Sequence, residues 1–421
     1  MPRSFAPAAL AAALTLTGAA MIRADEARSD RPRARAALPP AELAEVGPVH
    51  LRLASDLLRV VPDRGNVACS PWSIIQALGM TTAGARGETL AEMERALHLP
   101  GQARVHPLLG GLDRALMSRG QKPPPAWRKE ARPFTLRSAN ALWAQEGKRF
   151  EAPFLDGLAE HYGAGVRLVD FAADPDAARE RINGWVAAET NDRIRDLLRE
   201  VSPATRLVLV NAVYFLADWE HPFDPTSTRP RPFTRRDGTK VDAPTMHDTT
   251  LLAVAEHQGV RAVVLPYMGG EVEALVLLPP AGKLDATASS LHEVVPALTR
   301  GLKHELVALA LPKFEVGWRL AMKDALEALG MRKAFVFGQA DFSGMDGTRE
   351  LFIGAVTHQA WIAVDEKGTE AAAATAVEML AGGVPPPPVP FVVDRPFLLL
   401  VRDKATGAVL FVTRVEDPTA K

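Results

Sequence analysis

The 421-residue chain is poor in the residues that usually cross-link a fold or bind a metal. It has one cysteine, Cys69, so it can form no intramolecular disulfide and no cysteine-rich metal site. Cys69 lies in the apolar segment 66–74, which predicts a buried and unreactive thiol. Burial of apolar side chains must therefore supply the stability, and a content of 47% hydrophobic residues is enough for a large core.

No charge of one sign dominates the sequence. The 49 lysine and arginine residues nearly balance the 50 aspartate and glutamate residues, which leaves a net charge of −1. This balance argues against a nucleic-acid-binding or membrane-surface protein. No segment beyond the N-terminus has the long uncharged apolar run of a transmembrane helix.

The N-terminus has the pattern of a secretory signal peptide. Arg3 precedes a short apolar stretch over 8–20, and Ala20 and Ala24 are candidate cleavage points. A disordered alanine-rich tail is the alternative. We expect residues 1–24 to be a signal peptide and the protein to be secreted, either extracellular or periplasmic. Residues 25–42 are polar and basic, and we expect a flexible leader there.

The sequence also lacks the local motifs of catalysis. It has no Gly-x-Ser-x-Gly elbow, no Ser-x-x-Lys pair and no complete phosphate-binding loop. His292 and Glu293 begin a zinc-helix pattern, but no second histidine follows at the required spacing. We therefore predict no enzyme, no metal and no cofactor. A catalytic triad assembles in space rather than in sequence, so a hydrolase remains an alternative.

The apolar spacing predicts an α+β fold. Helical spacing covers 41–116 and 175–199, and Ser70 before Pro71 predicts the start of one helix. The nearly unbroken apolar run 207–216 predicts a strand buried on both faces. Further strands are expected at 134–144, 260–267, 272–278, 307–311, 351–364 and 396–415. Helices and strands mix without strict alternation, which favours antiparallel or mixed sheets.

The segment 365–388 carries most of the information about function. By propensity its alanine run favours a helix, and a low-complexity linker is a second interpretation. With the period of a strand, both glutamates, Glu370 and Glu378, fall on one face. The other face is uncharged and mostly small, and it comprises Thr369, Ala371, Ala373, Thr375, Val377 and Met379. Small side chains suit a strand that must slide into a packed interior, and Gly368 supplies a hinge before it.

This segment resembles the reactive-centre loop of the serpins, a family of protease inhibitors. The run Glu-Lys-Gly-Thr-Glu-Ala-Ala-Ala-Ala-Thr over 366–375 is similar to the hinge of that loop. Other segments match serpin motifs in the same order along the chain. They are 70–74, 140–143, 209–215, 219–223, 311–314, 341–345, 358–360, 395–397 and 407–411. The resemblance covers about 43–418, and so many ordered motifs make it specific.

The resemblance implies a single serpin domain over 43–418, with three β-sheets, about nine helices and an exposed reactive-centre loop at 366–388. It also implies a suicide inhibitor. A serine protease cuts the loop, and the cut loop inserts into the central sheet as a new strand and traps the acyl-enzyme. The expected partner is therefore a target serine protease in a covalent complex, and we expect a monomer. A non-inhibitory serpin-fold binding or storage protein is the alternative.

The resemblance further assigns residues around this loop. The hinge comprises Glu366, Gly368, Thr369, Glu370, Ala371, Ala372, Ala373, Ala374 and Thr375. The shutter is a hydrogen-bonded latch under the central sheet, and it comprises Ser70, Ser73, Asn211 and His358. The breach is the point where the loop first enters the sheet, and it comprises Trp219, Lys313 and Glu366. Ordinary satisfied core groups and a packing tryptophan beside a surface ion pair are the alternative interpretations.

The loop sequence also constrains the target. The usual serpin spacing from Glu366 places the cut near Gly382, so we expect the reactive bond among Leu380, Ala381, Gly382 and Gly383. No lysine or arginine occurs between Glu370 and the end of the proline run, which disfavours a trypsin-like enzyme. Small and apolar residues suit elastase-, subtilisin- or chymotrypsin-like proteases.

A basic loop precedes the first strand of the central sheet. Its cations are Arg119, Lys122, Arg128, Lys129 and Arg132. They lie near the position at which some serpins bind polyanions, so a polyanion is a possible second partner. A solvated basic face is the alternative interpretation.

Overall fold

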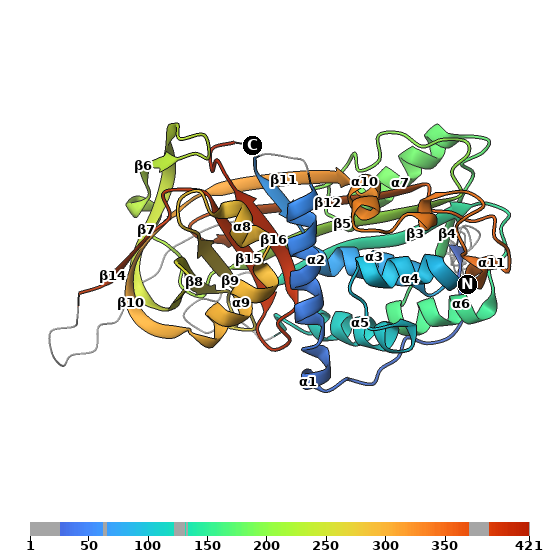
Figure 1. Ribbon diagram of the computed structural model, residues 1–421, viewed down its shortest axis with the longest axis horizontal. Helices are drawn as coiled ribbons and strands as arrows, with labels where there is room; N and C mark the ends of the chain where they lie inside the picture. The colour runs from blue at the N-terminus through green and yellow to red at the C-terminus, as the bar shows by residue number, and fades with distance from the viewer. Residues whose placement is uncertain (1–25, 62–64, 122–130, 132–133, 370–386, 421) are drawn as a thin grey trace, which may run out of the picture.

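The computed structural model describes residues 26–61, 65–121, 131, 134–369 and 387–420, and it has the expected α+β architecture (Figure 1). The predicted signal peptide (1–24), reactive bond (380–383) and most of the hinge (370–375) lie outside these residues. No described helix is long and apolar enough to span a bilayer. Cys69 is free and buried as predicted, and burial raises the pKa of its thiol to about 12.

The first sheet contains the two strands that border the candidate site. Its order is β1-β4-β3-β5-β12-β11, and β13 pairs with β5 beside this path. The strands are β1 (Glu26–Ala27), β3 (Thr135–Gln145), β4 (Val166–Val169), β5 (Leu207–Asp218), β11 (Phe314–Ala321), β12 (Ala355–Val364) and β13 (Gly368–Thr369). The neighbours β5 and β12 are parallel. A strand inserted between two parallel neighbours can pair with both of them in antiparallel orientation.

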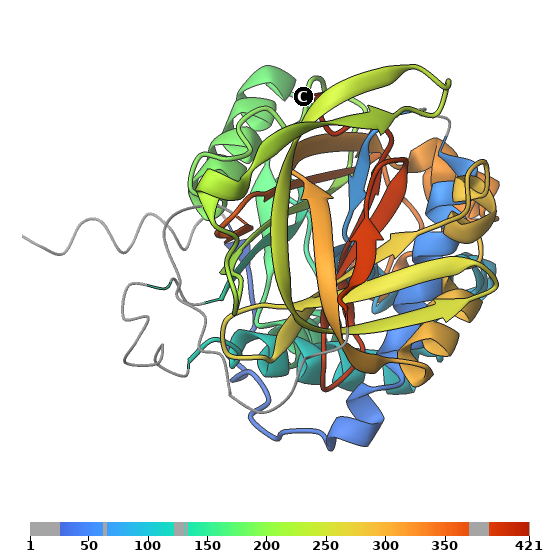
Figure 2. The ribbon, with the colours of Figure 1, turned by 90° about the vertical axis from the view of Figure 1, so that its left-hand side faces the viewer.

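The second sheet has nine strands in the order β14-β10-β7-β8-β9-β15-β16-β2, with β6 paired to β7. They are β2 (Val67–Cys69), β6 (Arg229–Thr234), β7 (Lys240–His257), β8 (Val260–Pro266), β9 (Val272–Leu278), β10 (Lys303–Pro312), β14 (Val389–Val392), β15 (Phe397–Asp403) and β16 (Val409–Val415). We expected three sheets, but the described strands form two networks because the 18-residue β7 pairs with β6, β8 and β10. Figure 2 shows β10 alongside this long strand.

Eleven α-helices cover the sheets within the described residues. They are α1 (Pro40–Leu43), α2 (Val46–Val60), α3 (Pro71–Thr82), α4 (Gly87–Ala96), α5 (Gln102–Met117), α6 (Ala152–Gly157), α7 (Pro175–Glu189), α8 (Leu284–Ala288), α9 (Leu291–Arg300), α10 (Lys323–Ala328) and α11 (Ser343–Asp346). The predicted start of α3 is confirmed, because the Ser70 hydroxyl accepts a hydrogen bond from the Ser73 amide at 3.2 Å. Short helical turns occupy η3 (Leu158–Tyr162), η4 (Pro225–Ser227) and η5 (Lys333–Phe335).

Strand β5 is buried on both faces, as its apolar run predicts. Val208, Val210 and Ala212 pack in a small core with α7, whereas Leu209 and Val213 pack in the main core. Helices α3 and α7 accordingly lie on opposite faces of the first sheet (Figure 1). A strand has two faces and both are covered, so polarity on one face cannot mark its register.

The leader expected to be flexible over 25–42 is bound to the domain in its described part, 26–42. Strand β1 adds to the edge of the first sheet by pairing with β4. The Ala34 amide donates to the Glu160 carbonyl at 2.8 Å, and Arg33 forms an ion pair with Asp113. Arg31 forms ion pairs with Asp156 of α6 and Glu160 of η3. Acidic groups on three elements thus bind this basic segment, although its composition alone predicts a solvated chain.

The helix expected over 175–199 ends at Glu189. Asn191 and Asp192 have φ values of 49° and 60°, in the left-handed region that ends helices. The Thr190 hydroxyl donates to the Val186 carbonyl at 2.7 Å and accepts from the Ile194 amide at 3.2 Å. These local hydrogen bonds replace those of a helix. The apolar residues after the turn therefore keep a helical spacing in the sequence although the chain there is not helical.

Candidate functional site

The candidate site is the seam between β5 and β12. The two strands pair in parallel from Ala355 opposite Val208 to Trp361 opposite Tyr214. Beyond that point β5 continues and pairs with β13 instead, in antiparallel orientation, with Thr369 opposite Ala217. The first residues of the segment that resembles a reactive-centre loop therefore already extend the sheet at the open end of this seam.

The structure places the predicted breach residues together at this open end. The Trp219 indole donates to the Asp365 carbonyl at 2.9 Å and stacks on Tyr267 with ring centroids 4.4 Å apart. The Trp219 amide donates to the Lys367 carbonyl and the Phe223 amide donates to the Glu366 carbonyl, both at 2.7 Å. The tryptophan is thus bonded to the loop backbone, which is more than the packing role considered as the alternative.

Glu366 holds the base of the loop with a charged contact. Its carboxylate lies 2.7 Å from the Lys313 ammonium, and it accepts a hydrogen bond from the Thr228 hydroxyl at 2.7 Å. The side chains of Glu366 and Lys313 are 11% and 37% exposed, so this is a partly buried pair rather than a surface one. Burial alone would raise the pKa of Glu366, but the hydrogen bonds from Lys313 and Thr228 outweigh it and lower the pKa below its usual value.

Thr369 is the first residue of the small-residue face predicted for the loop strand. Its side chain is already fully buried in this intact chain. Its hydroxyl is hydrogen-bonded to the Tyr267 hydroxyl at 2.9 Å. Gly368, before it, lies so close to β5 that a Cβ there would come within 2.2 Å of the Ala217 carbonyl oxygen. Only glycine permits this approach.

The four predicted shutter residues meet beneath the seam, on the face covered by α3. The Asn211 amide donates to the Ser73 carbonyl at 2.7 Å, and the Ser73 hydroxyl donates to Asn140 at 3.0 Å. His358 and Asn211 lie opposite each other on β12 and β5 and share a hydrogen bond between their side chains. The shutter therefore bridges the two strands that an inserting strand would separate.

The hydrogen bonds of His358 define its protonation state. Its Nε2 accepts from the Ser70 amide at 3.1 Å, so that nitrogen carries no proton. Nδ1 then carries the proton and donates to the Asn211 side-chain oxygen. Burial lowers the pKa of His358 to about 3, which keeps the ring neutral at physiological pH. A neutral imidazole can satisfy both partners at once, whereas an imidazolium cannot.

Sequence reasoning missed three residues that complete these two clusters. Asn140 joins the shutter, while Tyr267 and Thr228 join the breach. Asn140 lies in a segment recognised as a sheet strand, and an asparagine within an apolar strand is a usable signal. Tyr267 and Thr228 come from the second sheet and its connection, and nothing local in the sequence marks their position beside the loop.

Of the five cations considered for polyanion binding, the structure describes only Arg119. Arg119 is bound to Asp403 at 2.6 Å, and only 17% of its side chain is exposed. It is therefore committed to a structural ion pair, which corrects its inclusion in a free basic patch. Lys122, Arg128, Lys129 and Arg132 lie outside the described residues.

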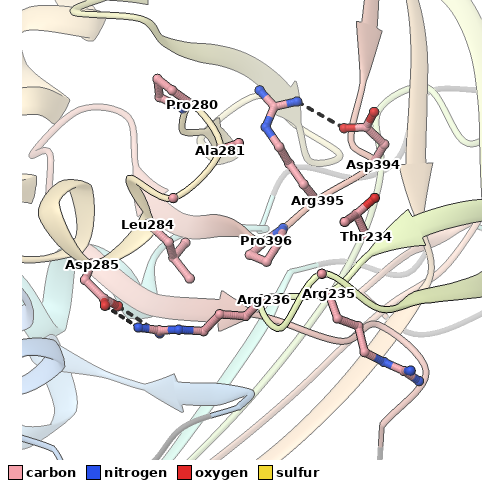
Figure 3. A pocket seen from close by; sticks show the side chains of 12 residues that line it. Thr234, Arg235, Arg236, Pro280, Ala281, Leu284, Asp285, Asp394, Arg395 and Pro396 are labelled. Atoms are coloured by element: carbon pink, nitrogen blue, oxygen red, sulfur yellow. Dashed lines mark hydrogen bonds and ion pairs between the residues drawn. The ribbon is translucent and has the colours of Figure 1, made fainter.

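Metal-binding clusters and cavities are the other places at which a ligand could bind. Among the described residues no three His, Cys, Asp or Glu side chains gather into a metal site. A cavity of about 380 Å³ lies between the β6–β7 turn, the start of α8 and the start of β15 (Figure 3). Its arginines bind carboxylates, with Arg236 on Asp285 and Arg395 on Asp394 (Figure 3). This cavity touches neither the shutter nor the breach.

Comparison with known proteins matches this architecture to one family. The family model described as serpin (serine protease inhibitor) matches residues 50–418. An uncharacterised serpin-like protein of Thermococcus kodakarensis is 38% identical, over 85% of this chain and 82% of its own length. A leukocyte elastase inhibitor of Bos taurus is 32% identical, over 89% of this chain and 100% of its own. The crystal structure of the thermophilic serpin tengpin in the native state superposes with a TM-score of 0.81 at 28% identity, covering 93% of this chain and 100% of that one.

Proposed function

The chain belongs to the serpin family, and from this membership we propose that it is a suicide inhibitor of serine proteases. One observation carries the proposal. Strand β13, the start of the reactive-centre loop, lies antiparallel to β5 at the open end of the seam between β5 and β12. A strand that continued β13 down this seam would pair antiparallel with both neighbours.

In this mechanism the protease supplies the catalytic serine, and the inhibitor supplies the cleaved bond and the conformational change. The protease serine attacks a peptide bond of the loop and forms an acyl-enzyme. The cut frees the loop, which inserts along β5 and carries the protease with it. Strand pairing and burial withheld from the intact form supply the driving force. Distortion of the protease then slows deacylation, and the complex stays covalent.

We further propose an elastase-, subtilisin- or chymotrypsin-like target. The window Leu380, Ala381, Gly382 and Gly383 offers only apolar or small residues to a specificity pocket. The bovine relative is named as an inhibitor of leukocyte elastase, which is consistent with this class. Secretion remains a proposal from the signal-like segment 1–24, and N-terminal sequencing of the exported protein tests it.

The direct test is a panel of serine proteases scored for complexes that survive SDS. We expect a covalent band with at least one elastase-, subtilisin- or chymotrypsin-like enzyme, and none with an active-site serine variant of the same protease. Clean loop cleavage by every enzyme with no covalent band would favour the alternative, a non-inhibitory binding protein of the same fold.

A further inference from the structure

The seam between β5 and β12 is covered on its outer face by the segment that follows α7, residues 190–206. Ile194, Leu197 and Leu198 of this segment pack with β5 in the small core. From the other side of the seam, Arg319 of β11 donates to the Asp196 carbonyl at 3.2 Å. The segment therefore contacts both halves of the sheet, on the face opposite the shutter.

One side chain of this segment lies over both strands of the seam. The Arg193 guanidinium is 5.8 Å from the ring centroid of Tyr214 on β5 and 5.1 Å from that of Trp361 on β12. The two ring centroids are 6.0 Å apart. Both distances lie within the range of a cation–π contact, so one cation is attracted by a ring on each strand.

The position of this contact along the seam is informative. Trp361 opposite Tyr214 is the last pair between β5 and β12 before the strands diverge toward β13. This pair is therefore the first that an inserting loop strand must separate. The Trp361 indole also donates a hydrogen bond to Glu315 of β11 at 3.0 Å. This bond holds the ring on the β11–β12 side of the seam when β5 moves away.

The turn after α7 fixes Arg193 in this place. Its amide donates to the Thr190 carbonyl at 3.0 Å, directly after the two left-handed residues Asn191 and Asp192. Left-handed conformations of residues other than glycine are uncommon and are maintained only by their surroundings. The hydrogen bonds of Thr190 to Val186 and Ile194 supply that restraint.

We infer that Arg193 is a clasp across the seam, a positioning residue that sets how fast the loop strand enters. This inference rests on the proposed function. Neighbouring strands lie about 4.8 Å apart, so a new strand between β5 and β12 roughly doubles their separation. One guanidinium cannot then remain over both rings. Insertion must break at least one of the two contacts, and this raises the barrier to insertion.

The test measures insertion without any protease. A synthetic peptide of residues 369–380 is incubated with the full chain, and its incorporation is followed by native electrophoresis and by the gain in heat stability. We expect Arg193→Leu to incorporate the peptide about two- to fivefold faster, which is the effect of one lost exposed cation–π contact. Arg193→Lys keeps a cation over the rings and should stay close to the unmodified chain.

Arg167 provides a matched control. Its guanidinium lies 5.5 Å from the ring of Trp143 and 4.7 Å from that of Trp185, so it also contacts two aromatic rings. Those rings belong to β3 and α7, and neither contact crosses the seam. We expect Arg167→Leu to lower native stability without accelerating incorporation. The double variant of Arg193→Leu with Trp361→Leu should be no faster than the faster single variant, because both remove one shared contact.

The outcomes separate the two proposals. Equal incorporation rates for Arg193→Leu, Arg167→Leu and the unmodified chain would overturn the clasp and leave the inhibitor proposal intact. An unmodified chain that takes up no peptide, and that gains no heat stability when its loop is cut, would overturn the proposed function and the clasp with it.

Discussion

At the scale of single residues, the shutter depends on one neutral histidine. His358 is fully buried, donates through Nδ1 and accepts through Nε2, and so joins the two strands of the seam to the start of α3. Removing one partner of a buried hydrogen bond costs about 1–3 kcal/mol. We expect His358→Ala to lower the midpoint of native unfolding and to speed spontaneous insertion. Unchanged values of both would refute the latch role.

The same residue predicts a dependence on pH. The pKa of His358 is about 3 in the folded chain against 6.5 ordinarily, so below pH 6.5 the unfolded chain binds a proton that the folded chain does not. Its contribution to stability is therefore complete above pH 6.5 and falls by roughly 1.4 kcal/mol per pH unit down to about pH 3. Urea unfolding of the unmodified chain and of His358→Gln at pH 7.5 and pH 5 measures the difference. The same change at exposed His304 is the control for the loss of a histidine outside the shutter.

At the scale of elements, the proposed mechanism requires the reactive-centre loop to change from an exposed substrate segment to a sheet strand. Since Thr369 is already buried against Tyr267, a bulky substitution there would disturb the intact form as well as insertion. Ala372 and Ala373 give a cleaner comparison, because identical residues occupy opposite parities of the future strand.

We expect Ala373→Arg to convert the inhibitor into a substrate and Ala372→Arg to leave inhibition nearly unchanged. Residue 373 shares the parity of Thr369 and would bury an unpaired guanidinium, which costs several kcal/mol. Insertion would then lag behind deacylation. The stoichiometry of inhibition and the ratio of covalent to cleaved product measure this. Equal ratios in the two variants would show that the loop does not insert as a strand in this register.

The position of the cut is a second property of this loop. We expect cleavage after Leu380, Ala381 or Gly382 by elastase-, subtilisin- or chymotrypsin-like enzymes, since no cationic residue is offered to trypsin. Mass spectrometry of the released C-terminal peptide identifies the bond. A peptide that begins outside 381–383, or rapid trapping of trypsin, would show that the bond is misplaced.

At the scale of the whole molecule, the seam is closed on both faces while its open end is already occupied. The shutter joins β5 and β12 below, Arg193 contacts both strands above, and β13 pairs with β5 at the end. An intact chain with these contacts has a barrier against completing its own sheet. The proposed mechanism requires the completed sheet to be the more stable form, and these contacts would then hold the intact chain in a metastable state.

Metastability predicts that a cut in the loop stabilises the protein. We expect the melting temperature to rise by tens of degrees after cleavage within 380–383, because the freed strand adds backbone pairing and apolar burial to the first sheet. Differential scanning calorimetry of intact and cleaved chains tests this. A melting temperature that stays constant after a complete cut is the result expected of the non-inhibitory alternative.

The sequence by itself determined the features that are local or periodic. The apolar run of β5, the Ser70 cap of α3 and the small residues on one parity of the loop each follow from rules that act over a few residues. The family resemblance rests on motifs of the same kind, and it assigned to the shutter and the breach residues that the structure places together.

Only the tertiary structure decided which distant groups meet and what they satisfy. The acidic groups on α5, α6 and η3 bind the basic leader, Asp403 binds Arg119, and the left-handed turn at Asn191 ends α7 early. The rings of Tyr214 and Trp361 are 147 positions apart in the sequence and meet only through the pairing of β5 with β12. Contacts of this range depend on the register of whole strands, and no local pattern encodes that register when both faces of the strand are buried.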